Sequence, residues 1–142
     1  TLNLDADGIS DLLNKKSGVL GITQLSSDMR EVETACEKGD PKAILSMKMY
    51  NYRIKKYIGA YAAAMGGVDI IVFTAGVGEN QWSTRQEACE GLEFLGVKID
   101  KELNKGLRGV EKVISTADSK VTVCIIPTDE ELMIATDTME LL

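Results

Sequence analysis

The longest regular pattern of apolar positions runs through the middle of the chain. Asp40 and Pro41 form a helix start signal, because aspartate caps a helix well and proline at the first helical position gives up a donor that would be unpaired anyway. Apolar residues then recur at helical spacing up to Gly66-Gly67, namely Ile44, Met47, Ile54, Ile58, Tyr61 and Met65. The pattern predicts a helix at about residues 41–65.

Two nearly continuous apolar runs predict strands. Residues 68–74 and 121–126 are rich in β-branched side chains, so we expect each strand to be buried on both faces. A helical pattern follows each run, which indicates an α/β fold with a parallel sheet covered by helices. The segment 97–119 between them is looser. Because typical sheets have about five strands and two strands leave both edges open, either the first forty residues hide further strands or the chain is part of a larger protein.

Other helices are predicted from capping residues. The first forty residues are irregular and glycine-containing, apart from a short helix through residues 30–38 that Ser27 can cap. Ser83, with Gln86 three residues later, predicts one helix that runs to Gly96. Thr128, with a glutamate three residues later, predicts the last helix in the same way.

Composition limits the class of protein. The 142 residues are 44% hydrophobic and 27% charged, as in a single soluble folded domain rather than a disordered chain. The net charge of −6 disfavours a nucleic-acid partner, and no apolar run approaches the roughly 20 residues that a membrane span needs. Cys36, Cys89 and Cys124 form no paired motif, which favours a reducing, cytoplasmic location.

The chain contains no histidine, so any chemistry must use carboxylates, arginine, lysine or backbone groups. The segment from Phe73 to Asn80 places Gly76 and Gly78 directly after a predicted strand, where ligands bind in open α/β sheets. It lacks the third glycine of the dinucleotide motif and the Lys-Ser/Thr of a P-loop. On the pattern alone, a tight turn is favoured over a phosphate or nucleotide site.

Two charged segments also have a structural and a functional interpretation. Residues 26–30, Ser-Ser-Asp-Met-Arg, are typical of a helix cap followed by a solvated charge pair. Residues 129–131, Asp-Glu-Glu, follow the second strand, where carboxylates stabilise a helix N-terminus. The functional alternative for the second segment is a Mg²⁺ site beside the phosphates of a nucleotide.

Taken together, five ordered segments closely resemble the acetate kinase family. They are residues 16–21 (KSGVLG), 26–30 (SSDMR), 52–61 (YRIKKYIGAY), 73–80 (FTAGVGEN) and 126–135 (IPTDEELMIA). The resemblance covers essentially the whole chain, residues 1–142, and matches the C-terminal, nucleotide-binding region of the family.

The resemblance implies part of a ribonuclease-H-like domain of the actin, sugar kinase and heat-shock ATPase superfamily, helix-rich with a small, mainly parallel sheet. It implies reversible phosphoryl transfer from ATP to acetate, giving ADP and acetyl phosphate, with Mg²⁺ as cofactor. Glu130 would be the magnesium-associated carboxylate. The nucleotide-binding residues would be Asp28, Met29, Arg30, Gly76, Val77, Gly78, Glu79 and Asn80.

The resemblance also implies what is absent. The family's acetate-binding groups, catalytic arginines, aspartate and histidine come from earlier in the chain. This sequence is therefore expected to hold no catalytic residue and to be inactive alone. The full-length enzyme is expected to be a cytoplasmic homodimer. Asp129 stands where the family usually has asparagine, and Thr136 where arginine is common. The alternatives are a propionate or butyrate kinase of the same family, or a non-catalytic nucleotide-binding or dimerisation module.

Overall fold

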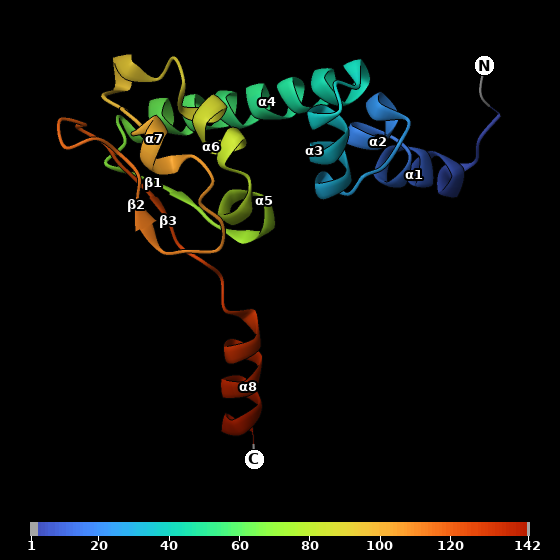
Figure 1. Ribbon diagram of the computed structural model, residues 1–142. Helices are drawn as coiled ribbons and strands as arrows, with labels where there is room; N and C mark the ends of the chain where they lie inside the picture. The colour runs from blue at the N-terminus through green and yellow to red at the C-terminus, as the bar shows by residue number, and fades with distance from the viewer. Residues whose placement is uncertain (1–2, 142) are drawn as a thin grey trace. The chain divides into compact units, whose positions relative to one another are not determined.

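A computed structural model describes residues 3–141 and contains many helices and one small sheet (Figure 1). The chain divides into two compact units at the Ile58–Gly59 bond, which we call the first and second units. The helices are α1 (Ala6–Lys15), α2 (Gly18–Thr23), α3 (Met29–Glu37), α4 (Pro41–Met65), α5 (Ala75–Asn80), α6 (Trp82–Cys89), a 3-10 helix (Glu93–Leu95), α7 (Lys101–Asn104) and α8 (Glu130–Glu140). The strands are β1 (Ile70–Phe73), β2 (Lys112–Val113) and β3 (Thr122–Ile125).

The predicted helix at 41–65 is confirmed as α4. The Asp40 carboxylate accepts a hydrogen bond from the backbone N–H of Ala43 at 2.8 Å, which caps the first turn. The last turn closes where the N–H of Gly67 donates to the carbonyl of Ala62 at 2.9 Å. Ala43 and Met47 of this helix join Val32 in the apolar cluster of the first unit.

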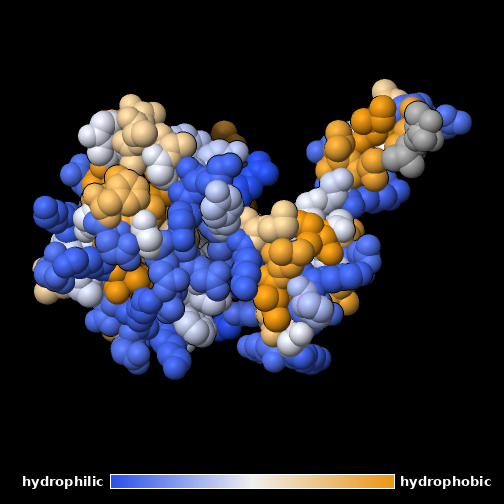
Figure 2. Space-filling view, turned by 90° about the horizontal axis from the view of Figure 1, so that it is seen from above, coloured by the Kyte–Doolittle hydropathy of each residue, from blue (hydrophilic) through white to orange (hydrophobic). Residues whose placement is uncertain are grey.

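The prediction that the first forty residues are irregular is wrong. Asp5 caps α1 by accepting from the N–H of Gly8 at 2.8 Å, and Lys15 pairs with Asp11 one turn earlier at 3.1 Å. Gly8 lies in the first turn of this amphipathic helix, and because glycine disfavours helices the sequence pattern did not predict it. Figure 2 shows apolar side chains gathered on the surface of the part of the molecule that carries α1, where Leu13 is 65% exposed.

The short helix predicted through residues 30–38 is confirmed as α3, but its predicted cap is wrong. Asp28, rather than Ser27, is the N-cap, and its carboxylate accepts from the N–H of Arg30 at 2.9 Å. The hydroxyl of Ser26 accepts from the N–H of Asp28 at 3.0 Å and so fixes the turn before the helix.

The sheet of the second unit has the order β1-β3-β2. β1 and β3 are parallel, as predicted, with Ile71 opposite Val123 and Phe73 opposite Ile125. β2 adds a short antiparallel pairing from within the segment 97–119, so the sheet is mixed. The core of this unit lies on one face of the sheet, where Ile71, Phe73, Val123 and Ile125 are buried with Ala88, Leu92, Val97, Ile114 and Val121.

Burial of the strands on both faces is contradicted. Ile70 is 58% and Val72 45% exposed, and the two strands alternate between buried and less buried positions. Within residues 3–141, no element covers this second face of the sheet enough to bury these side chains. The β-branched composition therefore reflected strand propensity and not two-sided burial.

Two helices also begin or end differently from the prediction. The helix expected to run from Ser83 to Gly96 begins at Trp82 and ends at Cys89, because Gly91 has a left-handed backbone with φ of 81° that starts a separate turn. The predicted capping box at Thr128 is absent. Asp129 caps α8 instead, accepting from the N–H of Leu132 at 3.0 Å.

Two further observations concern the cysteines and the possibility of a membrane-spanning helix. Cys36, Cys89 and Cys124 form no disulfide bond with one another. In the part of the chain that the structure describes, no helix is both long and apolar enough to cross a membrane.

Candidate functional site

The parallel pairing of β1 and β3 brings two of the candidate segments together. Both strands end at the same edge of the sheet, and the N–H of Ile126 donates to the carbonyl of Phe73 at 3.0 Å just beyond them. Residues 74–80 and 126–130 leave this edge side by side, where parallel sheets bind ligands.

The predicted glycine loop after β1 is wrong in detail, because residues 75–80 form the short helix α5. Ala75 begins it with a left-handed backbone, φ 57°, which costs a non-glycine residue about 1–2 kcal/mol. Gly78 packs so closely on β1 that an added Cβ would lie 3.1 Å from the carbonyl carbon of Phe73. Gly76 is exposed, and an added Cβ there would meet nothing within 4 Å.

Of the remaining residues of this segment, Val77 and Asn80 are half-buried and Glu79 is buried. The side-chain amide of Asn80 donates to the carbonyl of Gly76 at 2.9 Å and closes the helical turn. The exposed surface of α5 therefore lies at its start, around Gly76, while its end is packed into the unit.

The carboxylate of Glu79 binds the segment after β3. Its Oε1 atom accepts from the backbone N–H of Thr128 at 2.7 Å and from the Thr128 hydroxyl at 2.9 Å. The backbone N–H of Thr128 is the main reason that the pKa of Glu79 lies below its ordinary value; burial opposes the shift, and the Thr128 hydroxyl and the N–H of Ala75 add to it. Glu79 is thus a charged acceptor that joins α5 to the chain leading into α8.

Arg85 of α6 supports the end of α5, a role that no sequence pattern predicted. Its side chain is fully buried and donates to the carbonyls of Gly78 at 2.8 Å, Glu79 at 3.0 Å and Leu107 at 2.7 Å. Its Nε atom also donates to the side-chain oxygen of Asn104 at 2.8 Å. Burial, followed by repulsion from Arg108, lowers the pKa of Arg85 to about 10.

Glu130 is exposed at the first turn of α8, next to the exposed Glu131. Within residues 3–141, no three His, Cys, Asp or Glu side chains come together as a metal site. Mg²⁺ is commonly held by one or two protein carboxylates together with substrate phosphates and water. The carboxylates present here fit that donor set, and a cation held by protein groups alone does not fit.

The remaining predicted residues lie in the first unit. Besides capping α3, the Asp28 carboxylate binds the Arg30 guanidinium at 2.6 Å, and Arg30 is the main cause that lowers the pKa of Asp28 to about 2. Arg30 is 89% exposed, and Met29 packs against the apolar cluster that contains Val32. The expected charge pair is confirmed, while the cap is Asp28 itself and not Ser27.

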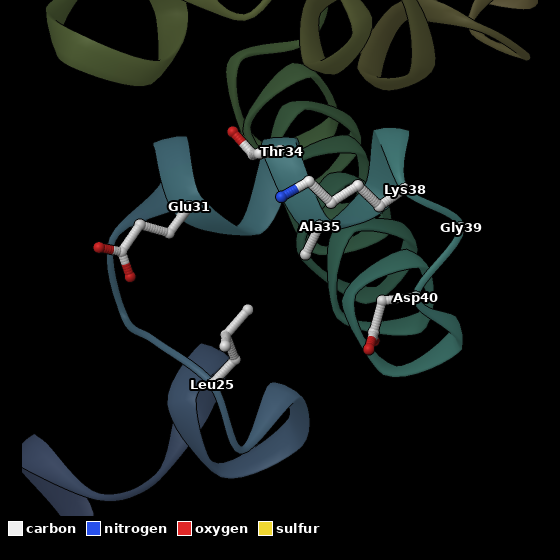
Figure 3. A pocket seen from close by; sticks show the side chains of 7 residues that line it. All are labelled: Leu25, Glu31, Thr34, Ala35, Lys38, Gly39 and Asp40. Carbon is white, nitrogen blue, oxygen red and sulfur yellow. The ribbon is translucent and has the colours of Figure 1, made fainter.

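A pocket of about 590 Å³ lies in the same unit (Figure 3). Its lining residues are Leu25, Glu31, Thr34, Ala35, Lys38, Gly39 and Asp40. Asp28, Met29 and Arg30 do not line it, although Glu31 follows them directly in α3. The pocket therefore lies next to Asp28, Met29 and Arg30 but is not formed by them.

Comparison with known proteins identifies the family to which this chain belongs. A sequence profile of the acetokinase family matches residues 1–136. The chain belongs to the acetokinase family. Acetate kinase of Phocaeicola vulgatus is 70% identical over 139 residues, which are 98% of this chain and 35% of that protein. The chain thus spans about a third of the length of the curated relatives that it matches.

Solved structures of the acetokinase family have the same fold as this chain. Acetate kinase of Porphyromonas gingivalis is 61% identical with a TM-score of 0.90, over 96% of this chain and 34% of that one. A propionate kinase of Francisella tularensis is 36% identical with a TM-score of 0.83, over 95% of this chain and 34% of that one. The α/β fold expected from the sequence is confirmed, with a mixed sheet of three short strands.

Proposed function

We propose that this chain supplies the nucleotide-side part of an acetate kinase, which transfers the γ-phosphoryl group of ATP to acetate and gives ADP and acetyl phosphate reversibly. The observation that carries the proposal is the side-by-side exit of α5 and the Thr128–Glu130 segment from the sheet of an acetokinase-family chain. One segment offers an exposed glycine for close approach of a nucleotide, and the other offers a carboxylate for its magnesium.

The proposed roles follow the position of each residue. Gly76, with Val77 and Asn80 behind it, lies against the adenosine side of the nucleotide. Gly78 allows α5 to pack closely on β1 and so sets the distance between the sheet and the nucleotide-facing side of α5. In the first unit, we propose Asp28, Met29 and Arg30 as further adenosine-binding residues, on the strength of the family resemblance.

Phosphoryl transfer asks the protein mainly for positioning and charge neutralisation, which these residues provide without a covalent nucleophile. Glu130 would hold Mg²⁺, directly or through water. When bound, Mg²⁺ neutralises charge on the phosphate oxygens. The role of this chain is then to bind and orient the nucleotide, since it holds no histidine and no assigned catalytic residue.

We further propose that residues 1–142 alone do not turn over acetate. The curated relatives are about three times as long, and we assign acetate binding and the groups at the transferring phosphoryl to the part of the enzyme that this chain does not include. Acetyl phosphate formation from ATP and acetate tests this directly. Robust turnover by the isolated chain would contradict it.

A second candidate is a kinase for a longer carboxylate. The propionate kinase of Francisella tularensis has nearly the same fold over 95% of this chain, so the described residues do not separate the two substrates. The test is kcat/KM for acetate, propionate and butyrate in the complete enzyme. We expect acetate to be preferred, because relatives called acetate kinase are 58–70% identical to this chain.

The non-catalytic alternative makes a different prediction for the nucleotide. Saturable binding of Mg-ADP by the isolated chain would indicate that the pocket forms without the rest of the enzyme, and no binding would indicate that it does not. The homodimer and the cytoplasmic location stay predictions; the oligomeric state of the complete enzyme is measured by light scattering.

A further inference from the structure

The carboxylate of Glu79 joins the glycine-containing helix α5 to the segment that follows β3. Its two hydrogen bonds come from the backbone N–H and the hydroxyl of Thr128, at 2.7 and 2.9 Å. Ala75 is the residue with the unfavourable left-handed backbone at the start of α5. The carboxylate at the other end of α5 therefore fixes the distance between this helix and the segment after β3.

The backbone of Glu79 is fixed independently of its side chain. Its carbonyl accepts from Arg85 at 3.0 Å, and the N–H of Gly109 donates to the same carbonyl at 3.1 Å. The carboxylate therefore extends toward Thr128 from an anchored position. Thr128 lies two residues before Glu130, so a shift of Thr128 relative to α5 moves the magnesium-associated carboxylate relative to the nucleotide surface.

These contacts leave Glu79 buried, with its Oε1 atom occupied by two donors from Thr128. At Oε1, a ribose hydroxyl would have to compete with bonds of 2.7 and 2.9 Å, both strengthened by the charge of the acceptor, and Glu79 as a whole is only 9% exposed. The exposed part of the segment is Gly76, on the first turn of α5.

We propose that Glu79 is a positioning residue that fixes the spacing between the nucleotide surface of α5 and Glu130, and that it does not bind the nucleotide itself. This inference rests on the proposed function and revises the sequence expectation that Glu79 is a nucleotide ligand. Its distinguishing consequence is that loss of the Glu79–Thr128 link changes the dependence of the reaction on magnesium.

The test uses a full-length chimera in which residues 1–142 replace the matching third of Porphyromonas gingivalis acetate kinase. Glu79→Ala removes the acceptor, and Thr128→Val removes the hydroxyl donor while keeping the backbone N–H. We expect the Mg²⁺ concentration for half-maximal kcat/KM to rise about 10-fold in Glu79→Ala and less in Thr128→Val. The double variant should resemble Glu79→Ala, because both changes break one link.

Conservative variants separate positioning from general loss of structure. Glu79→Gln keeps an acceptor oxygen and Thr128→Ser keeps the hydroxyl, so both should stay within about 3-fold of the parent in their Mg²⁺ requirement. Glu102→Ala removes an exposed carboxylate of α7 and serves as the matched control. Circular dichroism confirms that each variant is folded.

The inference is overturned if Glu79→Ala raises KM for ATP while its Mg²⁺ requirement stays that of the parent, or if the two single effects simply add. Its failure is distinguishable from failure of the proposed function, which appears as a parent chimera without acetate kinase activity. In either case the same variants are also compared by calorimetric titration of ADP at several Mg²⁺ concentrations. Equal Mg²⁺ dependence in parent and Glu79→Ala, or no binding by the parent, then rejects the positioning role as well.

Discussion

Arg85 and Asn104, 19 residues apart in the sequence, are joined by a buried hydrogen bond of 2.8 Å between Nε and the amide oxygen. The Asn104 amide nitrogen in turn donates to the carbonyl of Trp82 at 2.8 Å. The pair links α6 to α7, and Arg85 also binds the carbonyls at the end of α5. This buried network holds the candidate nucleotide surface in place.

Replacing Arg85 should therefore destabilise the protein strongly. Arg85→Met leaves buried carbonyl and amide oxygens without donors, and we expect it to lower the free energy of unfolding by about 3 kcal/mol or more. Arg85→Lys should recover only part of this, because an ammonium does not span the same set of acceptors. Urea unfolding measures both. Lys105→Met, which removes an exposed positive charge, should cost less than about 0.5 kcal/mol.

The two glycines of α5 should respond in opposite ways to alanine. Gly78→Ala places a Cβ 3.1 Å from the backbone of Phe73, and we expect a loss of about 1–3 kcal/mol in unfolding free energy. Gly76→Ala meets open space and should leave stability unchanged or slightly higher. In the chimera, Gly76→Ala should nevertheless weaken Mg-ADP binding. Equal stability of the two variants would contradict the packing of α5 on β1.

The pKa of Asp28 should follow its pairing with Arg30. Pairing lowers the pKa from 3.8 to about 2, so the stabilisation from the pair is present at neutral pH and is lost as the pH falls from about 4 through about 2. Arg30→Ala should raise the pKa of Asp28, which carbon-13 NMR titration of the carboxyl group measures. An unchanged pKa in this variant would show that the cap alone sets it.

Asp129→Asn keeps a capping side chain at the start of α8 but removes the negative charge beside Glu130. Asparagine caps helices as well as aspartate does, so the helix content of α8 by circular dichroism should be unchanged. Removal of one negative charge beside Glu130 should raise the Mg²⁺ requirement of the chimera about 2- to 3-fold, and less at high salt. A lower Mg²⁺ requirement would indicate that Asp129 weakens the metal site.

The elements that the sequence predicted well are those with local signals. The bounds of α4 follow from Asp40-Pro41 and Gly66-Gly67, and the β1–β3 pairing follows from two apolar runs. The hidden helix α1 shows the limit of such signals, because Gly8 lies inside its first turn while Asp5 caps it. Helix propensity alone does not tell whether the stabilising cap of Asp5 outweighs the destabilising glycine.

The parts of the site that the sequence missed depend on distant partners. Thr128 reads as a helix cap, but its hydroxyl binds Glu79, 49 residues away. Arg85 carries no motif in the sequence, but it binds carbonyls up to 22 residues away. A capping pattern encodes only neighbours along the chain, so neither contact was predictable before β1 and β3 were paired.

The most direct test of the central claim is acetyl phosphate formation from ATP and acetate by two proteins in parallel. One is the isolated chain, and the other is the chimera in which the chain replaces the matching third of Porphyromonas gingivalis acetate kinase. We predict Mg²⁺-dependent turnover by the chimera that is abolished or reduced at least 10-fold by Glu130→Ala, and none by the isolated chain. A folded chimera without activity, or turnover by the isolated chain, would contradict the claim.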